Sequence, residues 1–133
     1  EDVPMADGRR GRPARWPVML AYLASPYSHP DPAVMEDRFD AVCREAARLM
    51  FGGAHVYSPI AHTHPIAMRG NLPTDWTYWE GYDHVMISAS DELWVLMLDG
   101  WQESKGVTAE IKIAADLGKP VLYVRPGASN GDR

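Results

Sequence analysis

Four short apolar runs alternate with amphipathic segments along this chain, and no other sequence feature constrains the fold more tightly. The runs cover residues 18–23, 54–57, 92–98 and 121–124. Uninterrupted apolar runs of this length favour strands that are buried on both faces of a parallel sheet. Parallel neighbours need crossover connections, which helices usually supply. The sequence therefore predicts an α/β fold: a small doubly wound, Rossmann-like parallel sheet of about four to five strands, in an order such as 2-1-3-4, with helices on both faces.

Three of the connecting segments show clear signals of helix initiation. We expect helices over about residues 32–51, 76–90 and 105–117, each preceded by a side chain that can cap a helix. These caps are Asp31, Asp75 and Ser104. Residues 60–73 contain two histidines and two prolines and predict a long loop instead. Loops of that length in a small domain are often functional.

The length of 133 residues predicts one domain, which we place over residues 17–125. A flexible basic arm (1–16) precedes it and a polar tail (126–133) follows it. The single cysteine, Cys43, provides neither a disulfide framework nor a multi-cysteine zinc site. No stretch approaches 18 uncharged apolar residues, and no apolar segment of a signal peptide is visible. We therefore expect a cytoplasmic protein without a membrane partner.

The net charge of −5 disfavours a polymeric nucleic acid as partner, because such partners need a basic face. The exception is the arm, which carries Arg9, Arg10, Arg12 and Arg15. We interpret this run as a solvated segment, and contact with a phosphate or a partner subunit stays open. Five Trp and six Tyr against two Phe form an aromatic set that suits wet pockets and interfaces.

Two carboxylates are placed unusually on the predicted helices. At 100° per residue, Glu110 lies about 60° from Val107, on the edge of the buried stripe of its helix. Asp83 lies beside the apolar stripe of the preceding helix. A carboxylate beside an apolar helix face costs free energy unless it is paired with another group or takes part in binding or catalysis. An ordinary flanking Glu and an Asp paired with an arginine remain open alternatives, but two carboxylates near an aromatic-lined pocket suit glycosidic chemistry.

The start of the third predicted helix is a candidate anion site. Its first N–H groups are free, Ser104 adds a hydroxyl, and Gly106 leaves space above them. The first strand is followed by no Gly-x-Gly-x-x-Gly motif, and a P-loop is also absent. His62 and His64 have no third metal ligand at an obvious spacing. We therefore expect neither a cofactor nor a metal.

Three motifs occur in an order that resembles a known superfamily. They are Tyr-Leu-Ala-Ser-Pro-Tyr over residues 22–27, Asp83, and Ser-Lys-Gly-Val-Thr-Ala-Glu over residues 104–110. Within residues 20–124 this set resembles the nucleoside 2-deoxyribosyltransferase superfamily, which includes nucleoside 5'-monophosphate N-glycosidases. Residues 100–106 further resemble an uncharacterised branch of it. The longer turn over residues 99–103 and the proline-rich loop after Tyr22 depart from the monophosphate hydrolases, and both changes touch the expected ligand pocket.

The resemblance implies a retaining mechanism. Glu110 would be the nucleophile, Asp83 the second catalytic acid and Tyr22 the active-site tyrosine. The expected substrate-binding residues are Ser25, Tyr27, His62, Trp101, Ser104, Gly106 and Val107. Members of the superfamily complete their sites across homo-oligomer interfaces, so a dimer or tetramer is implied.

The expected activity is cleavage or transfer at the N-glycosidic bond of a nucleoside or nucleoside 5'-monophosphate. The base, the sugar, and the choice between hydrolysis and transfer stay open. A nucleotide-binding or sensing module with little turnover is the alternative function. A purely structural protein is a third possibility. It predicts a carboxylate pair well beyond 9 Å apart, whereas a retaining pair is about 5 to 5.5 Å apart.

Overall fold

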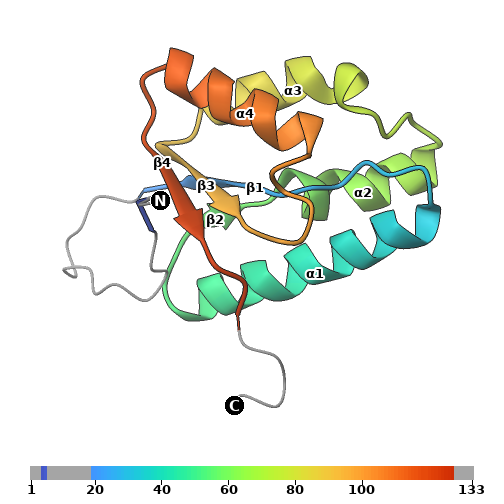
Figure 1. The fold of residues 1–133 in the computed structure, drawn as a ribbon, viewed down its shortest axis with the longest axis horizontal. Helices are drawn as coiled ribbons and strands as arrows, with labels where there is room; N and C mark the ends of the chain where they lie inside the picture. The colour runs from blue at the N-terminus through green and yellow to red at the C-terminus, as the bar shows by residue number, and fades with distance from the viewer. Residues whose placement is uncertain (1–3, 6–18, 128–133) are drawn as a thin grey trace.

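The computed structural model describes residues 4–5 and 19–127. At its centre lies a four-stranded, all-parallel sheet with strand order β2-β1-β3-β4 (Figure 1). The strands are β1 (Ala21–Ala24), β2 (Val56–Tyr57), β3 (Glu92–Leu96) and β4 (Val121–Val124). This confirms the predicted α/β fold and its strand order. The basic arginines of the expected arm and most of the expected tail lie outside the described residues.

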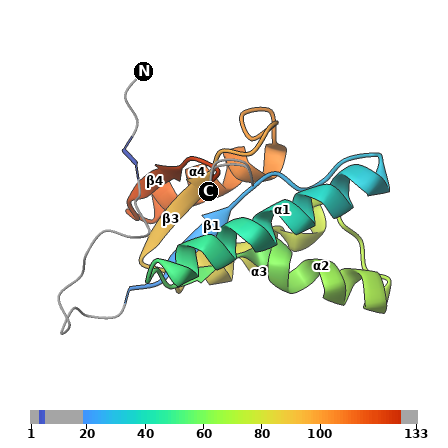
Figure 2. The same ribbon diagram turned by 90° about the horizontal axis from the view of Figure 1, so that it is seen from below.

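Four helices cover the two faces of the sheet: α1 (Pro32–Phe51), α2 (Pro59–Gly70), α3 (Trp76–Ser88) and α4 (Lys105–Asp116). Successive side chains of a strand point to opposite faces, so each strand contributes to two cores. Ala21 and Leu23 pack in the core that contains the buried residues of α1, whereas Tyr22 and Ala24 pack in the core that contains those of α3 and α4. Figure 2 shows α1 and α2 side by side, and α3 and α4 also pack together.

Three helices begin where the capping signals predict. The carboxylate of Asp31 accepts a hydrogen bond from the N–H of Ala33 at 2.9 Å. In the same way Asp75 caps α3, and the Ser104 hydroxyl accepts from the N–H of Val107 at 3.1 Å at the start of α4. These bonds satisfy N–H groups that have no partner inside the helix.

The prediction of a long loop over residues 60–73 is wrong, because most of this segment forms α2. The Ser58 hydroxyl accepts from the N–H of Ala61 at 3.0 Å, and Pro59 occupies the first turn, where a missing N–H costs nothing. Pro65 lies inside the helix. The buried face of α2, which includes Ile60 and His64, stabilises the helix despite this proline. Of the two prolines in the predicted loop, Pro65 is therefore tolerated inside the helix and Pro73 follows its end.

The fold brings several loops to the carboxyl edge of the sheet. The chain leaves β1 towards β2 on one side and enters β3 on the other, so the switch point lies between β1 and β3. Ligands of open parallel sheets bind outside this edge. Within the described residues, the helices are too short or too polar to cross a membrane.

Candidate functional site

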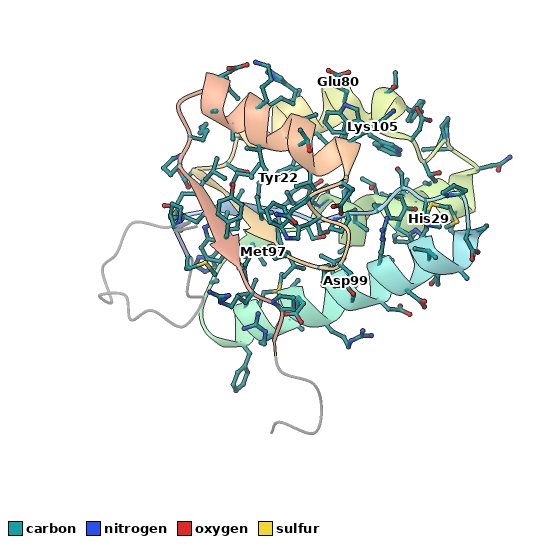
Figure 3. All side chains as sticks on the ribbon, in the orientation of Figure 1. Tyr22, His29, Glu80, Met97, Asp99 and Lys105 are labelled. Atoms are coloured by element: carbon teal, nitrogen blue, oxygen red, sulfur yellow. The ribbon has the colours of Figure 1, made fainter. Side chains whose placement is uncertain are left out.

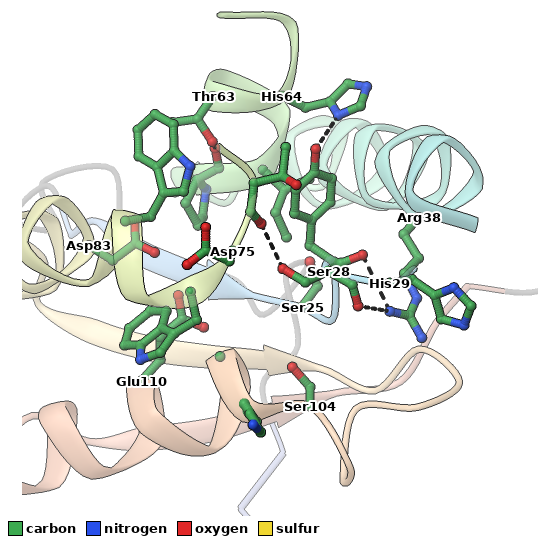
Figure 4. A pocket seen from close by; sticks show the side chains of 18 of the residues that line it. Ser25, Ser28, His29, Arg38, Thr63, His64, Asp75, Asp83, Ser104 and Glu110 are labelled. Carbon is green, nitrogen blue, oxygen red and sulfur yellow. Dashed lines mark hydrogen bonds between the residues drawn. The ribbon is translucent and has the colours of Figure 1, made fainter. Parts of the chain in front are cut away.

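A pocket of about 490 Å³ opens at the carboxyl edge of the sheet (Figure 4). Its walls come from the segments that follow β1, β2 and β3 and from the N-terminal half of α3. Pockets of this size hold small ligands of nucleotide dimensions. Of the predicted site residues, six line it: Ser25, Tyr27, Asp83, Ser104, Gly106 and Glu110.

Glu110 is buried, with 5% of its surface exposed, and it reaches the pocket from the second turn of α4. Its position on the helix follows the wheel prediction, because Val107 and Ala114 on the same helix are fully buried. Tyr22 comes from the middle of β1, and its hydroxyl donates to Glu110 Oε2 at 2.5 Å. Figure 3 places Tyr22 between the sheet and α4. The strand therefore holds the carboxyl of the helix in one orientation.

Asp83 reaches the same wall from α3 and is 7% exposed. Its predicted position beside the apolar stripe needs a correction, since Asp83 and Ile87 are themselves the buried residues of α3. Its neighbour Tyr82 is 39% exposed. The rotation of α3 about its axis directs the carboxylate of Asp83 to the pocket and not to an apolar core.

The two carboxyls interact directly, and each perturbs the other. Burial raises the pKa of Asp83 to about 6, although hydrogen bonds with Glu110 and Tyr22 oppose the rise. Burial also raises the pKa of Glu110 well above its ordinary value, and the neighbouring charge of Asp83 raises it further. Burial and the charge of Glu110 raise the pKa of Tyr22, which keeps its hydroxyl a donor. The raised pKa values favour a state in which the coupled pair retains a proton.

Beside this pair lies the N-terminus of α4, where Ser104, Lys105 and Gly106 line the pocket. A Cβ atom at Gly106 would lie 3.6 Å from Trp76 and 3.8 Å from the Ser104 hydroxyl oxygen. Both distances are ordinary contacts, so the open space expected above Gly106 is bounded by Trp76. The helix start supplies free N–H groups and a positive dipole end to the pocket.

Ser25, the first residue after β1, has a hydroxyl that makes no hydrogen bond within the described part of the chain. The residue is 5% exposed and lines the pocket. A buried hydroxyl without a partner costs free energy. A polar ligand group in the pocket would satisfy it.

Arg38 of α1 lines the pocket on the side away from the carboxyl pair, and Figure 4 shows it beside His29. Its Nη1 donates to the carbonyl oxygens of Tyr27 and Ser28 at 3.3 and 3.0 Å. A Cβ atom at Gly100 would lie 2.9 Å from its Nη2. The guanidinium thus donates to the loop after β1 and lies close to the backbone of the loop after β3.

Three predicted substrate-binding residues do not line this pocket. His62 lies two positions from His64 on α2, so it points to another side and its ring lies 6.0 Å from that of Tyr57. Trp101 packs against Tyr123, with ring centres 5.6 Å apart. The side chain of Val107 is fully buried in the core, while its N–H bonds to Ser104.

Sequence reasoning missed Arg38, His64, Trp76 and Trp79 as pocket residues. Trp76 and Trp79 are one turn apart at the start of α3, which begins next to the sheet edge, so their spacing was a usable signal. No such signal marked Arg38, because in the sequence it resembles any other charged residue of an amphipathic helix. Within the described ranges, no group of three or more His, Cys, Asp or Glu side chains is arranged to hold a metal ion.

Comparison with known proteins adds one relationship. No curated protein matches the sequence. The family described as "Domain of unknown function (DUF1937)" matches residues 19–125, which contain the whole sheet, all four helices and every pocket residue. The chain is therefore a member of this DUF1937 family.

Proposed function

We propose that this protein cleaves or transfers a glycosyl group at the N-glycosidic bond of a nucleoside or nucleoside 5'-monophosphate. The observation that carries the proposal is the buried group of Glu110, Asp83 and Tyr22, whose two carboxyl side chains line a nucleotide-sized pocket. Glycosidases that retain configuration use two neighbouring carboxyls, one as nucleophile and one as acid and base. Burial raises the pKa of both carboxyls here, and the charge of Asp83 raises that of Glu110 further, which favours a proton retained by the pair.

The proposed reaction has two steps. In the first, a carboxylate oxygen of Glu110 bonds to C1' while the bond from C1' to the base nitrogen breaks. The electron pair goes to the base, which takes the proton from Asp83. In the second step water attacks C1', Asp83 accepts its proton, and Glu110 leaves as a carboxylate. Attack by the nitrogen of a second base in place of water would give transfer.

Tyr22 would act on the charge of Glu110 during these steps. Its hydroxyl donates to Oε2, which leaves Oε1 as the oxygen without this bond. A hydrogen bond to a charged acceptor stabilises the ionised carboxyl by about 1.5 to 3 kcal/mol. We therefore assign Oε1 as the attacking atom and Oε2 as the oxygen that Tyr22 holds.

The α4 N-terminus supports a monophosphate as the preferred form of the substrate. Ser104, Lys105 and Gly106 lie two turns or less from Glu110 on the same helix. An anion at a helix N-terminus is stabilised by the free N–H groups and the dipole. The unpartnered Ser25 hydroxyl would add a further donor or acceptor for the ligand.

A binding or sensing module on the same fold is the second candidate, and the raised pKa of Glu110 favours it. Burial and the charge of Asp83 favour the form of Glu110 that carries a proton over the carboxylate that must attack C1'. Turnover needs this proton to pass to Asp83 when a ligand binds. A module that only binds a nucleotide needs no such transfer.

Base release separates the two candidates. The purified protein is incubated with the common nucleosides and their 5'-monophosphates, and free base is quantified by chromatography. We expect release from at least one substrate, and loss of release with retained binding in Glu110→Gln. His62→Gln, outside the pocket, should keep the activity. Binding of a nucleotide by the wild type without any base release would favour the module, and neither binding nor release would refute both.

A further inference from the structure

A second buried polar network lies in the pocket wall, apart from the carboxyl pair. The ring of His64 on α2 is 5% exposed and contacts two partners. Its Nε2 lies 2.9 Å from Oε1 of Glu36, and its Nδ1 lies 2.6 Å from the hydroxyl of Tyr27. Tyr27 and His64 both line the pocket, whereas Glu36 is 57% exposed on α1. The proposed two-step reaction uses none of these three side chains.

The chemistry of the partners fixes the direction of the bond to Glu36, and in a neutral ring it fixes the direction of the bond to Tyr27 as well. A carboxylate only accepts, so Nε2 must carry the proton in its bond to Glu36. In the neutral imidazole Nδ1 is then an acceptor, and the Tyr27 hydroxyl must donate to it. Because the Tyr27 hydroxyl donates its only proton to His64, it has none to donate to a ligand. Any ligand group that bonds to this oxygen must therefore be a donor.

The network is also held rigidly. The His64 ring stacks on Phe39 with ring centres 4.4 Å apart, and it meets the Tyr27 ring edge-on. Arg38 fixes the backbone of the same loop by donating to the Tyr27 carbonyl oxygen. Burial and the charge of Glu36 raise the pKa of Tyr27, so the residue stays a neutral phenol. These contacts leave the hydroxyl little freedom to turn its proton towards a ligand.

We propose that Tyr27 is a specificity-determining residue, which Glu36 and His64 hold as a hydrogen-bond acceptor, and that it selects ligands presenting a hydroxyl or N–H donor to its oxygen. On a nucleotide such a donor is a sugar hydroxyl, an amino group of the base or a ring N–H of the base. This selection rests on the proposed function for the class of ligand. The direction of the hydrogen bonds rests on the geometry alone.

The first measurement tests the direction of the bonds without a ligand. Two-bond proton–nitrogen NMR spectra distinguish the two neutral tautomers of histidine, and His64→Gln identifies the His64 signal. We expect the Nε2–H tautomer in the wild type. Glu36→Gln should allow both tautomers, because an amide can donate or accept. Asp37→Asn, an exposed neighbour on α1, should leave the spectrum unchanged. An Nδ1–H tautomer in the wild type would overturn the proposal.

The second measurement tests selection by calorimetry in the Glu110→Gln background, where the proposed chemistry is blocked. The probes are the four common ribonucleoside 5'-monophosphates, followed by the 2'-deoxy, 3'-deoxy, amino-free and ring-N-methylated analogues of the tightest one. We expect one analogue to bind about tenfold more weakly, the loss typical of a buried acceptor left without its donor. Tyr27→Phe should reduce this difference to about twofold or less, and the identity of the analogue shows whether sugar or base supplies the donor.

Full discrimination in Tyr27→Phe would overturn the proposal, as would equal binding of all analogues to the protein that retains Tyr27. Relaxed discrimination in Glu36→Gln, with Asp37→Asn unchanged, would support it. If none of the four monophosphates binds, the proposed function fails and the selection fails with it. The tautomer measured by NMR then still reports the hydrogen-bond directions independently.

Discussion

Replacing Asp83 by asparagine should stabilise the protein above pH 6, and the gain should disappear in acid. The pKa of Asp83 rises from an ordinary value of 3.8 to about 6 on folding. The folded chain therefore binds more protons than the unfolded chain between these values, so stability falls as the pH rises through this window. At 1.36 kcal/mol per pKa unit, the two-unit rise costs about 3 kcal/mol at pH 7 to 8.

Asparagine keeps the shape of the side chain and removes its charge. The neutral residue also removes the negative neighbour that raises the pKa of Glu110. Both effects favour the variant at high pH, whereas at pH 4 wild-type Asp83 is largely protonated in the folded state and the two proteins should differ little. The difference in unfolding free energy should therefore grow by about 3 kcal/mol between pH 4 and pH 8.

Urea unfolding followed by tryptophan fluorescence at pH 4, 5, 6, 7 and 8 measures this difference. Packing changes caused by the substitution shift the difference in unfolding free energy equally at all five pH values. The change of this difference with pH therefore reports the titration of Asp83. Asp37→Asn, an exposed site on α1, serves as the matched control and should show a difference that varies by a few tenths of a kcal/mol. A difference for Asp83→Asn that is independent of pH, or that falls towards pH 8, would refute the reasoning.

Substitutions at four further positions test separate parts of the fold and the site. Gly100→Ala should destabilise the fold by about 1 to 2 kcal/mol, because φ is +89° and the new Cβ would lie 2.9 Å from Arg38 Nη2. Gly81→Ala, inside α3 with open space around it, should instead stabilise by about 0.5 to 1 kcal/mol in the same denaturation assay. Ser104→Ala should cost about 1 kcal/mol of stability and weaken monophosphate binding in calorimetry, whereas Ser104→Thr should retain both. Tyr22→Phe should raise the pKa of Glu110 further, since the hydrogen bond that lowers it is lost. A carboxyl-carbon NMR titration that matches the wild type would contradict this.

The four strands and three of the helices follow from local signals in the sequence. Buried parallel strands need continuous apolar runs, and caps such as Asp31 and Ser104 act within three residues of the helix start. The burial of Glu110 follows from helical spacing for the same reason, since its distance from Val107 along the helix decides its side. Helical spacing predicted Asp83 beside the buried stripe of α3, whereas the structure places Asp83 within that stripe.

The other features of the site depend on contacts between distant parts of the chain. Tyr22 and Glu110 are 88 residues apart, and no spacing rule connects them. The rotation of α3 that buries Asp83 and exposes Tyr82 depends on its packing against α4. His62 and His64 looked equivalent in a predicted loop, whereas the helix α2 directs only His64 to the pocket. Helix packing and an unrecognised helix therefore account for the missed residues.

Trapping of a covalent intermediate tests the central proposal most directly. A 5'-monophosphate of a 2'-fluoroarabino nucleoside slows both steps, and peptide mass spectrometry after incubation locates any glycosyl adduct. The account predicts one adduct, on the peptide segment and side chain of Glu110, with release of an equal amount of base. Base release without an adduct on Glu110, or an adduct on Asp83 instead, would contradict it.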